Sequence, residues 1–300
     1  MQNIVNNLKG GWDCCEEKAI VPYFNMEKKL LVMDLDGTLL RDDKTISDYT
    51  LNIFSHLDRS KVKICLASGR CEQMMKIYAD LLKSDYVISS NGAVVKKWDS
   101  QQLTRHITLE PKTLYDIVKF LKYNKINYMM YSAEKMYCSS YTEEFKKRFR
   151  AYENICHLMG KEEKLECINL EEYKEELPEN IVKLVAYEKD KDKMTLFQSM
   201  LESEFAEKVA CESTGYGLLN VAAYNVSKEI AVESVREFYK IEKKNTYIFG
   251  DYSNDLSMFS CGDNKIAVAN AQEEVKLKAT EIILSNNEDG IAHYIKQKNI

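Results

Sequence analysis

Residues 29–39, Lys-Leu-Leu-Val-Met-Asp-Leu-Asp-Gly-Thr-Leu, decide the fold of this chain. An apolar run ends there on two acids spaced two apart, followed by a glycine. In an open parallel sheet, ligands bind just beyond the carboxyl ends of the strands. Alternation along a strand would direct Asp34 and Asp36 into that crevice and Leu35 away from it, while Gly37 lets the chain turn. The stretch therefore predicts a buried strand that delivers two carboxylates to a site.

Short apolar runs alternate with helical patterns from this point onward. The runs are KKLLVMD, KVKICLAS, DYVISSN, NTYIFGD, NKIAVAN and TEIILS. They are nearly continuous in Val, Ile and Leu, which is typical of strands buried on both faces of a parallel sheet. Strand–helix alternation predicts an α/β fold with a doubly wound, Rossmann-like core. We expect residues 26–93 and 225–300 to form this core.

The intervening block, residues 94–224, has a different pattern. It combines hairpin-like runs, such as VVKKWDSQQLTRHITL and INYMMYSAEKMYCSS, with amphipathic helices and further strands. Segregated hairpins and helices favour an α+β module, which we expect to be a two-layer cap inserted into the core. Residues 1–25 show no clear period, and we expect a peripheral N-terminal extension. A mistaken upstream start codon is one hypothesis for it, which mass spectrometry of the native N-terminus would test.

A second acidic motif, Gly250-Asp-Tyr-Ser-Asn-Asp255, also follows an apolar run. Either Asn254 or Asp255 alone could be explained as a helix N-cap. With Asp34 and Asp36, however, Asp251 and Asp255 would place four carboxylates at one edge of the sheet, where they would repel one another. A hard divalent cation with oxygen ligands relieves that repulsion, and magnesium suits phosphate chemistry.

Four further residues follow predicted strands or open predicted helices. Ser68 and Gly69 come directly after VKICLA, where a hydroxyl and exposed backbone N–H groups can bind an anion. Lys228 opens a helix, and its ammonium could neutralise a phosphate or steady Asp34, although most lysines are simply solvated surface. Asn91 sits in an Asn-Gly pair, which is foremost a turn signal, but it would face the same crevice.

Composition excludes several classes of protein. The 300-residue chain has a formal net charge of -5, so no overall positive field draws it to nucleic acid. Its apolar runs are far shorter than a membrane span, and its N-terminus lacks a secretory pattern. The nine cysteines are scattered without a C-x-x-C pair, which favours reduced thiols and a cytoplasmic protein.

Taken in order, the motifs resemble those of the haloacid dehalogenase superfamily, and more closely its Cof-type phosphatases with a large α/β cap (subclass IIB). The four family motifs match DLDGTL at Asp34, LASGR at Ser68, VSK at Lys228 and GDYSND at Asp251. SSNGA at Asn91 matches a further family pattern. The resemblance begins near Met26 and reaches the C-terminus, although the cap matches more in length and layout than in sequence. Two small departures are Ser68, where threonine is frequent, and Glu229, where glycine is frequent.

The resemblance implies a Mg²⁺-dependent phosphatase that hydrolyses a small phosphorylated metabolite, such as a sugar phosphate or phosphorylated cofactor, through an aspartyl phosphate. Asp34 would be the nucleophile and Asp36 the general acid/base, with its pKa raised by crowding carboxylates. Magnesium would be held by Asp34, the backbone carbonyl of Asp36, and Asp251, with Asp255 in support. The groups expected to hold the phosphoryl group are Ser68, the Gly69 backbone, Lys228 and Asn254, and Asn91 is a supporting candidate.

Two other functions remain compatible with these motifs. A phosphomutase would form the same phospho-Asp34 but pass the phosphate to a sugar hydroxyl instead of water. A non-catalytic phosphate-binding protein would usually lack one essential group, yet Asp34, Asp36, Lys228 and Asp251 are all present. The sequence leaves the substrate, the cap residues that select it and the oligomeric state open.

Overall fold

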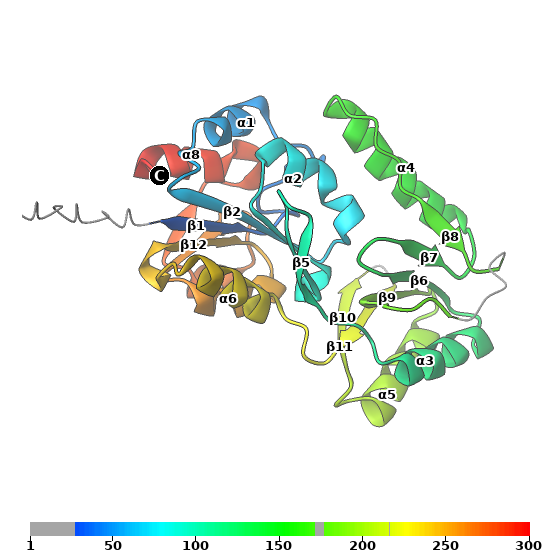
Figure 1. Cartoon of the computed structure of the whole chain (residues 1–300). Helices are drawn as coiled ribbons and strands as arrows, with labels where there is room; N and C mark the ends of the chain where they lie inside the picture. Colours follow the sequence, from blue (N-terminus) through cyan, green and yellow to red (C-terminus); the bar gives the residue numbers. More distant parts are fainter. Residues whose placement is uncertain (1–27, 172–176, 216) are drawn as a thin grey trace, which may run out of the picture.

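Two β-sheets organise the chain, one in a core and one in a cap (Figure 1). The structure is a computed structural model that describes residues 28–171, 177–215 and 217–300. The expected extension at residues 1–25 lies outside this described part. The core sheet has eight strands in the order β14-β13-β12-β1-β2-β3-β4-β5, and the cap sheet has six in the order β10-β11-β9-β6-β7-β8.

The strands from β14 to β3 in the core sheet are parallel to their neighbours, whereas β4 and β5 are antiparallel. The core strands are β1 (Lys29–Met33), β2 (Val62–Ala67), β3 (Tyr86–Ser89), β4 (Val94–Lys97), β5 (Gln102–His106), β12 (Thr246–Gly250), β13 (Asn264–Val268) and β14 (Glu281–Ile283). The parallel strands inside the sheet, such as β1 and β2, are nearly continuous in apolar residues because both of their faces are buried, whereas the edge strand β14 is partly exposed.

Helices cover both faces of this sheet, which confirms the doubly wound fold class. They are α1 (Asp48–Ser55), α2 (Lys76–Leu82), α6 (Lys228–Tyr239), α7 (Glu273–Lys278) and α8 (Gly290–Lys298), with a 3₁₀ segment, η4, at Ser253–Cys261. The sheet has a hydrophobic cluster on each face. Leu31 and Met33 of β1 pack in the cluster with residues of α1, α2 and α8, whereas Leu30 and Val32 pack in the cluster with residues of α6, α7 and η4. Successive side chains of one strand thus hold the two helical layers on opposite faces.

The β4–β5 hairpin corrects the expected domain boundary at residue 94. The sequence places it in the cap, but β4 pairs with β3, with Ser89 opposite Val94. The turn between them explains the difference, because Asn91 (φ 57°) and Gly92 (φ 102°) adopt left-handed conformations that reverse the chain within a few residues. The core sheet therefore continues to His106, and the cap elements begin after it.

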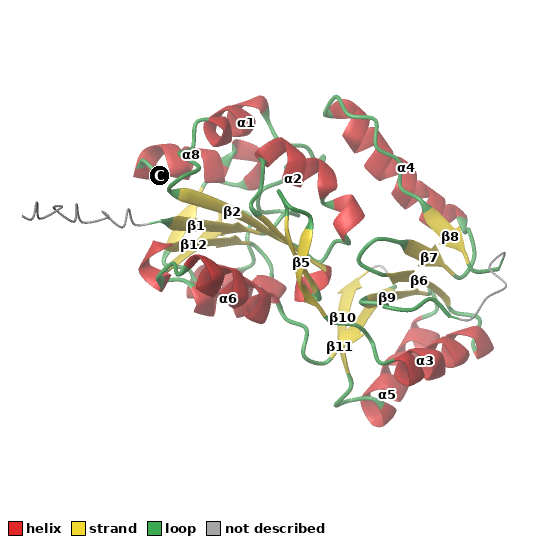
Figure 2. Cartoon of the chain, viewed as in Figure 1, coloured by secondary structure: helices red, strands yellow, loops and turns green. Residues whose placement is uncertain are grey.

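The cap has helices on both faces of its sheet, where the sequence predicts only two layers (Figure 2). Its strands are β6 (Asn127–Tyr131), β7 (Met136–Cys138), β8 (Cys167–Asn169), β9 (Lys183–Tyr187), β10 (Val209–Gly215) and β11 (Leu218–Ala223), and its helices are α3 (Pro111–Tyr123), α4 (Glu143–Leu158) and α5 (Lys191–Glu204). The α3 and α5 helices pack with Tyr128 and Met130 of β6, whereas α4 packs with Met129 and Tyr131 of the same strand. The expected β6–β7 hairpin is present.

Several contacts tie the cap to the core beside the loops that follow β2 and β3. The Tyr152 hydroxyl on α4 donates to the Gln73 carbonyl at 2.9 Å, and Lys76 pairs with Glu163 at 2.6 Å.

Within the described ranges, no helix has both the length and the apolar composition needed to cross a membrane.

Gly92 provides a test of the turn that ends β3. A Cβ at this position would lie 2.2 Å from the carbonyl oxygen of Ser227, a backbone atom that cannot swing away. We expect Gly92→Ala to lower the free energy of unfolding by about 2–4 kcal/mol, from left-handed strain plus the clash, as measured by urea denaturation. The matched control is Gly160→Ala, where φ is 70° and nothing lies within 4 Å of the added Cβ. Equal losses in the two variants would contradict this account of the turn.

Candidate active site

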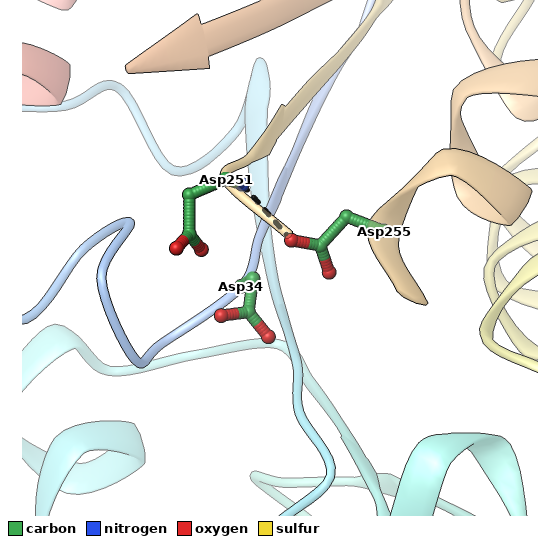
Figure 3. A group of neighbouring side chains, drawn as sticks. All are labelled: Asp34, Asp251 and Asp255. Atoms are coloured by element: carbon green, nitrogen blue, oxygen red, sulfur yellow. Dashed lines mark hydrogen bonds between the residues drawn. The ribbon is translucent and has the colours of Figure 1, made fainter. Parts of the chain in front are cut away.

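The carboxyl ends of β1 and β12 bring the two acidic motifs together. These strands pair in parallel, with Met33 opposite Phe249, so Asp34 and Asp251 leave the sheet side by side. The carboxylates of Asp34, Asp251 and Asp255 each offer an oxygen within 4.8 Å of the others (Figure 3). Residues separated by more than two hundred positions in the sequence thus form one acidic cluster.

The ammonium of Lys228 lies inside this cluster. Its Nζ is 2.6 Å from Asp34 Oδ1 and 2.7 Å from Asp255 Oδ1, and its side chain is only 1% exposed. Ser227 caps α6 by accepting a hydrogen bond from the Ile230 N–H, which fixes Lys228 as the first residue of the helix. Burial alone would lower the pKa of Lys228, but the two carboxylates raise it well above its ordinary value, so the group stays charged.

Asp255 holds Lys228 and the loop after β12 in place through hydrogen bonds, and we call this arrangement the Asp255 brace. Its Oδ1 accepts from Lys228, and its Oδ2 accepts from the backbone N–H groups of Asp251 at 3.0 Å and Tyr252 at 3.2 Å. The first of these backbone contacts is the dashed line in Figure 3. Because the side chain is fully buried and both oxygens are engaged, Asp255 orients Lys228 and the loop that carries Asp251.

The loop after Asp36 supports Asp251 from the opposite side. Thr38 Oγ1 donates to Asp251 Oδ1 at 2.7 Å, and Asn270 Nδ2 donates to the Gly37 carbonyl at 2.7 Å. Gly37 adopts φ 84°, and a Cβ there would lie 2.4 Å from Asp251 Oδ2. Only glycine allows the loop to approach the carboxylate this closely.

The charge balance of the cluster fits a divalent cation. Burial raises the pKa of Asp34 well above its ordinary range, although Lys228 lowers it. Burial likewise raises the pKa of Asp251 to about 6 against the lowering effect of its Thr38 hydrogen bond. Both shifts show that ionised carboxylates are unfavourable here without further positive charge, since three acids face a single ammonium. Oxygen donors of this kind suit Mg²⁺. Of the expected ligands, the side chains of Asp34 and Asp251 belong to this cluster.

The surroundings of Asp36 contradict the expectation that crowding by other carboxylates raises the pKa of this residue. Burial does act in that direction, but Arg70 holds the carboxylate through two hydrogen bonds, Nε to Oδ2 at 2.6 Å and Nη2 to Oδ1 at 2.7 Å. Lys44 adds an ion pair at 3.1 Å. Together these cations lower the pKa of Asp36 to about 2. The expectation was wrong because it considered only the acids of the two motifs and gave Arg70 no part.

The loop after β2 forms the other wall of the site. Ser68 is buried, its Oγ accepts from the Arg70 N–H at 3.2 Å, and its carbonyl accepts from the Asn91 N–H at 3.0 Å. The Asn91 side chain in turn donates to Glu212 of the cap at 2.9 Å. Gly69 belongs to this same loop, whereas Asn254 is the second residue of η4.

A cavity of about 470 Å³ opens between the core and the cap above these residues. Its core lining includes Asp34, Asp36, Ser68, Gly69, Asn91, Asp251 and Asn254. Lys228 lines an adjoining cavity that shares Asn91 and Asn254 with it. The predicted site residues thus lie together, except that Asp255 is buried behind them.

Sequence reasoning missed several residues of the site and of its cavity. Thr38 and Arg70 belong to the quoted motifs, so a position inside a motif was the signal that could have identified them. Arg148 comes from α4 and carries no such signal. Lys183 of β9 also lies on the cavity wall, and no motif marks it in the sequence.

Comparison with known proteins matches residues 31–295 to the family model for haloacid dehalogenase-like hydrolases. The chain belongs to this family. Among curated relatives of this hydrolase, the 5-amino-6-(5-phospho-D-ribitylamino)uracil phosphatase YitU of Bacillus subtilis is 25% identical over 281 residues, which cover 91% of this chain and 98% of YitU. Phosphatase YwpJ of the same organism is 26% identical, covering 89% of this chain and 99% of YwpJ.

Solved structures show the same fold. A haloacid dehalogenase-like hydrolase from Bacteroides thetaiotaomicron superposes with a TM-score of 0.80 at 23% identity, covering 91% of this chain and all of that one. The subclass IIB sugar phosphatase BT4131 superposes with a TM-score of 0.71 at 18% identity, covering 91% and 99% of the two chains. The predicted superfamily is confirmed, and the phosphatases among the relatives support the predicted enzyme class.

The brace formed by Asp255 can be tested through stability. Asp255→Asn removes a buried charge that pairs with Lys228 and presents an amide to backbone N–H donors. We expect a loss of about 2–4 kcal/mol in the free energy of unfolding, because the variant leaves Lys228 short of a counter-charge. Asp263→Asn, an exposed position near the end of η4, is the matched control and should change stability by less than about 0.5 kcal/mol. A loss of similar size in both variants, measured by urea unfolding, would rule out the proposed brace.

Proposed function

We propose that this hydrolase is a Mg²⁺-dependent phosphatase of small phosphate monoesters that works through an aspartyl phosphate on Asp34. The observation that carries the proposal is the meeting of Asp34, Asp251 and Lys228 at one edge of the sheet, beside the Ser68 loop and open to a cavity. Family membership and the phosphatases among the relatives support hydrolysis of phosphate esters.

Asp34, the backbone carbonyl of Asp36, and Asp251 are the groups that would hold magnesium. When bound, the cation supplies charge neutralisation that lets a carboxylate meet an anionic phosphate. Phosphoryl transfer asks the protein mainly for alignment and electrostatic stabilisation, so the donors of Ser68, Gly69, Lys228 and Asn254 can provide the rest.

Asp34 is oriented for attack on phosphorus. Its Oδ1 is held by Lys228, whereas Oδ2 accepts no hydrogen bond from the part of the chain that the structure describes. In the first step a bond forms between a carboxylate oxygen of Asp34 and phosphorus, while the bond from phosphorus to the leaving alcohol breaks. Water then attacks phosphorus, which releases inorganic phosphate and restores the carboxylate.

Asp36 would transfer the protons of both steps. It gives a proton to the leaving oxygen in the first step and accepts one from water in the second. Its contacts with Arg70 and Lys44 favour the ionised form, which suits the second role. The first role requires that these contacts loosen, and we propose that an anionic substrate draws Arg70 away as it enters the cavity.

Substitution of the two acids tests this assignment. We expect Asp34→Asn to lower Mg²⁺-dependent release of phosphate from p-nitrophenyl phosphate by at least about a thousandfold, because the nucleophile is lost. Asp36→Asn should also lose most of its activity, but it should accumulate phosphate on Asp34, because water is no longer activated. Mass spectrometry of the trapped protein locates the phosphate. Ordinary turnover by Asp34→Asn, or phosphate found on another residue, would refute the proposed nucleophile.

A phosphomutase would use the same Asp34, and product analysis separates the two reactions. Supplied with hexose 6-phosphates and Mg²⁺, a phosphatase releases free phosphate, whereas a mutase yields the isomeric sugar phosphate. The relatives named as phosphatases favour hydrolysis. A non-catalytic role is disfavoured because Asp34, Asp36, Lys228 and Asp251 are all retained at the site.

We further propose that the substrate is a small metabolite. A cavity of about 470 Å³ falls in the range typical of small-molecule sites. The phosphorylated ribitylaminouracil in the name of YitU belongs in a substrate screen together with sugar phosphates and phosphorylated cofactors. A cytoplasmic location and the absence of nucleic-acid or membrane partners stay predictions from composition.

A further inference from the structure

Lys183 is a cap lysine whose ammonium lies in the wall of the catalytic cavity. It starts β9, opposite Tyr131 of β6, and it and Val185 are the two residues of β9 that line the cavity. The residue is 9% exposed, and its Nζ donates to the carbonyl of Gly69 at 2.9 Å. The cap therefore places a buried cation directly against the loop proposed to hold the phosphoryl group.

This ammonium has no carboxylate partner within ion-pair distance among the described residues. An ammonium has three N–H donors, and the Gly69 carbonyl uses one of them. Burial lowers the pKa of Lys183 to about 8, although Glu212 acts in the opposite direction, so the group is still mostly charged at pH 7. A buried, charged and incompletely bonded ammonium is costly unless a ligand completes its contacts.

A second cation lies on the same cavity. Arg148 of α4 is exposed, lines the cavity with Lys183, and forms no ion pair within the described ranges. The Arg148 guanidinium is close enough to Lys183 to lower the pKa of its ammonium. Two like charges on one wall of a pocket repel each other, and an anion between them removes that repulsion.

The acids of the cavity are already engaged elsewhere. Asp34 and Asp251 face the proposed cation, Asp36 is paired with Arg70 and Lys44, and Glu212 accepts from Asn91. Beside the two cap cations, Tyr131 and Val185 give the wall an apolar part. Glu212 keeps its negative charge, but Lys183 and Arg148 outnumber it, so the cap side of the cavity has a net positive charge available to a substrate.

We propose that Lys183, assisted by Arg148, binds a second anionic group on the leaving-group part of the substrate. The preferred substrate class is thus a small phosphate monoester that carries a further carboxylate or phosphate. This inference rests on the proposed function for the position of the phosphoryl group. It assigns selectivity to the cap and leaves the reaction at Asp34 unchanged.

Matched probes measure this selectivity. In 3-phosphoglycerate a carboxylate replaces the hydroxymethyl group of glycerol 3-phosphate, and fructose 1,6-bisphosphate adds a phosphate to fructose 6-phosphate. We expect kcat/KM of the wild-type protein to favour the anionic member of at least one pair by about tenfold or more, the effect of hydrogen bonds to a charged group. Lys183→Met should reduce that ratio to within about threefold of one, and Arg148→Met should reduce it by a smaller factor.

Binding to a variant without the nucleophile separates this inference from the proposed chemistry. Calorimetric titration of Asp34→Asn with the same probes in Mg²⁺ should show the same preference, and it should disappear in the Asp34→Asn/Lys183→Met double variant. If the wild-type protein hydrolyses none of the probes but Asp34→Asn still prefers the anionic ones, the proposed phosphatase activity fails and the anion site stands.

Two controls keep the result specific. Lys119→Met removes an exposed cap lysine on α3 that lines no part of the cavity, and it should retain the wild-type ratio. Arg148 is exposed, so Arg148→Met tests the site even if Lys183→Met fails to fold. Equal use of both members of each pair by the wild-type protein, or a ratio that neither Lys183→Met nor Arg148→Met changes, would overturn the proposal.

Discussion

The buried contact of Lys228 with Asp34 and Asp255 is the constraint on which the rest of the site depends. It joins the end of β1, the start of α6 and the segment after β12, which lie far apart in the sequence. Taking charges out of water is costly unless each finds a partner, so these three elements fit together in one arrangement. The fold thereby holds Asp34, the proposed nucleophile, in a defined orientation without a substrate.

The same small region gives its acids opposite properties. Burial raises the pKa values of Asp34 and Asp251, whereas Arg70 and Lys44 overcome burial and lower the pKa of Asp36. Carboxyl groups with contrasting environments can take contrasting parts in one reaction. Here the first two suit the proposed shared cation, and the third is held in its ionised form by Arg70.

Sequence patterns could predict the parallel sheet and the meeting of the two acidic motifs, because buried parallel strands are nearly continuous in apolar residues and end at one edge. They could not assign the β4–β5 hairpin to the core, because the left-handed conformations of Asn91 and Gly92 decide where that strand pairs. The pairing of Asp36 with Arg70 also escaped prediction. It joins side chains from two loops, and periodicity carries no information about such contacts.

The alternation along β9 has a consequence for how this enzyme can change over time. Leu184 and Ala186 pack in the interior of the cap with α3 and α5, while Lys183 and Val185 face the cavity. Val185 also packs with α4, so Lys183 is the cavity-side residue of β9 that takes no part in an apolar cluster. On the proposed function, substitutions at Lys183 would change substrate preference with little effect on the packing of the cap, which suits a family whose members share an architecture and differ in what they cleave.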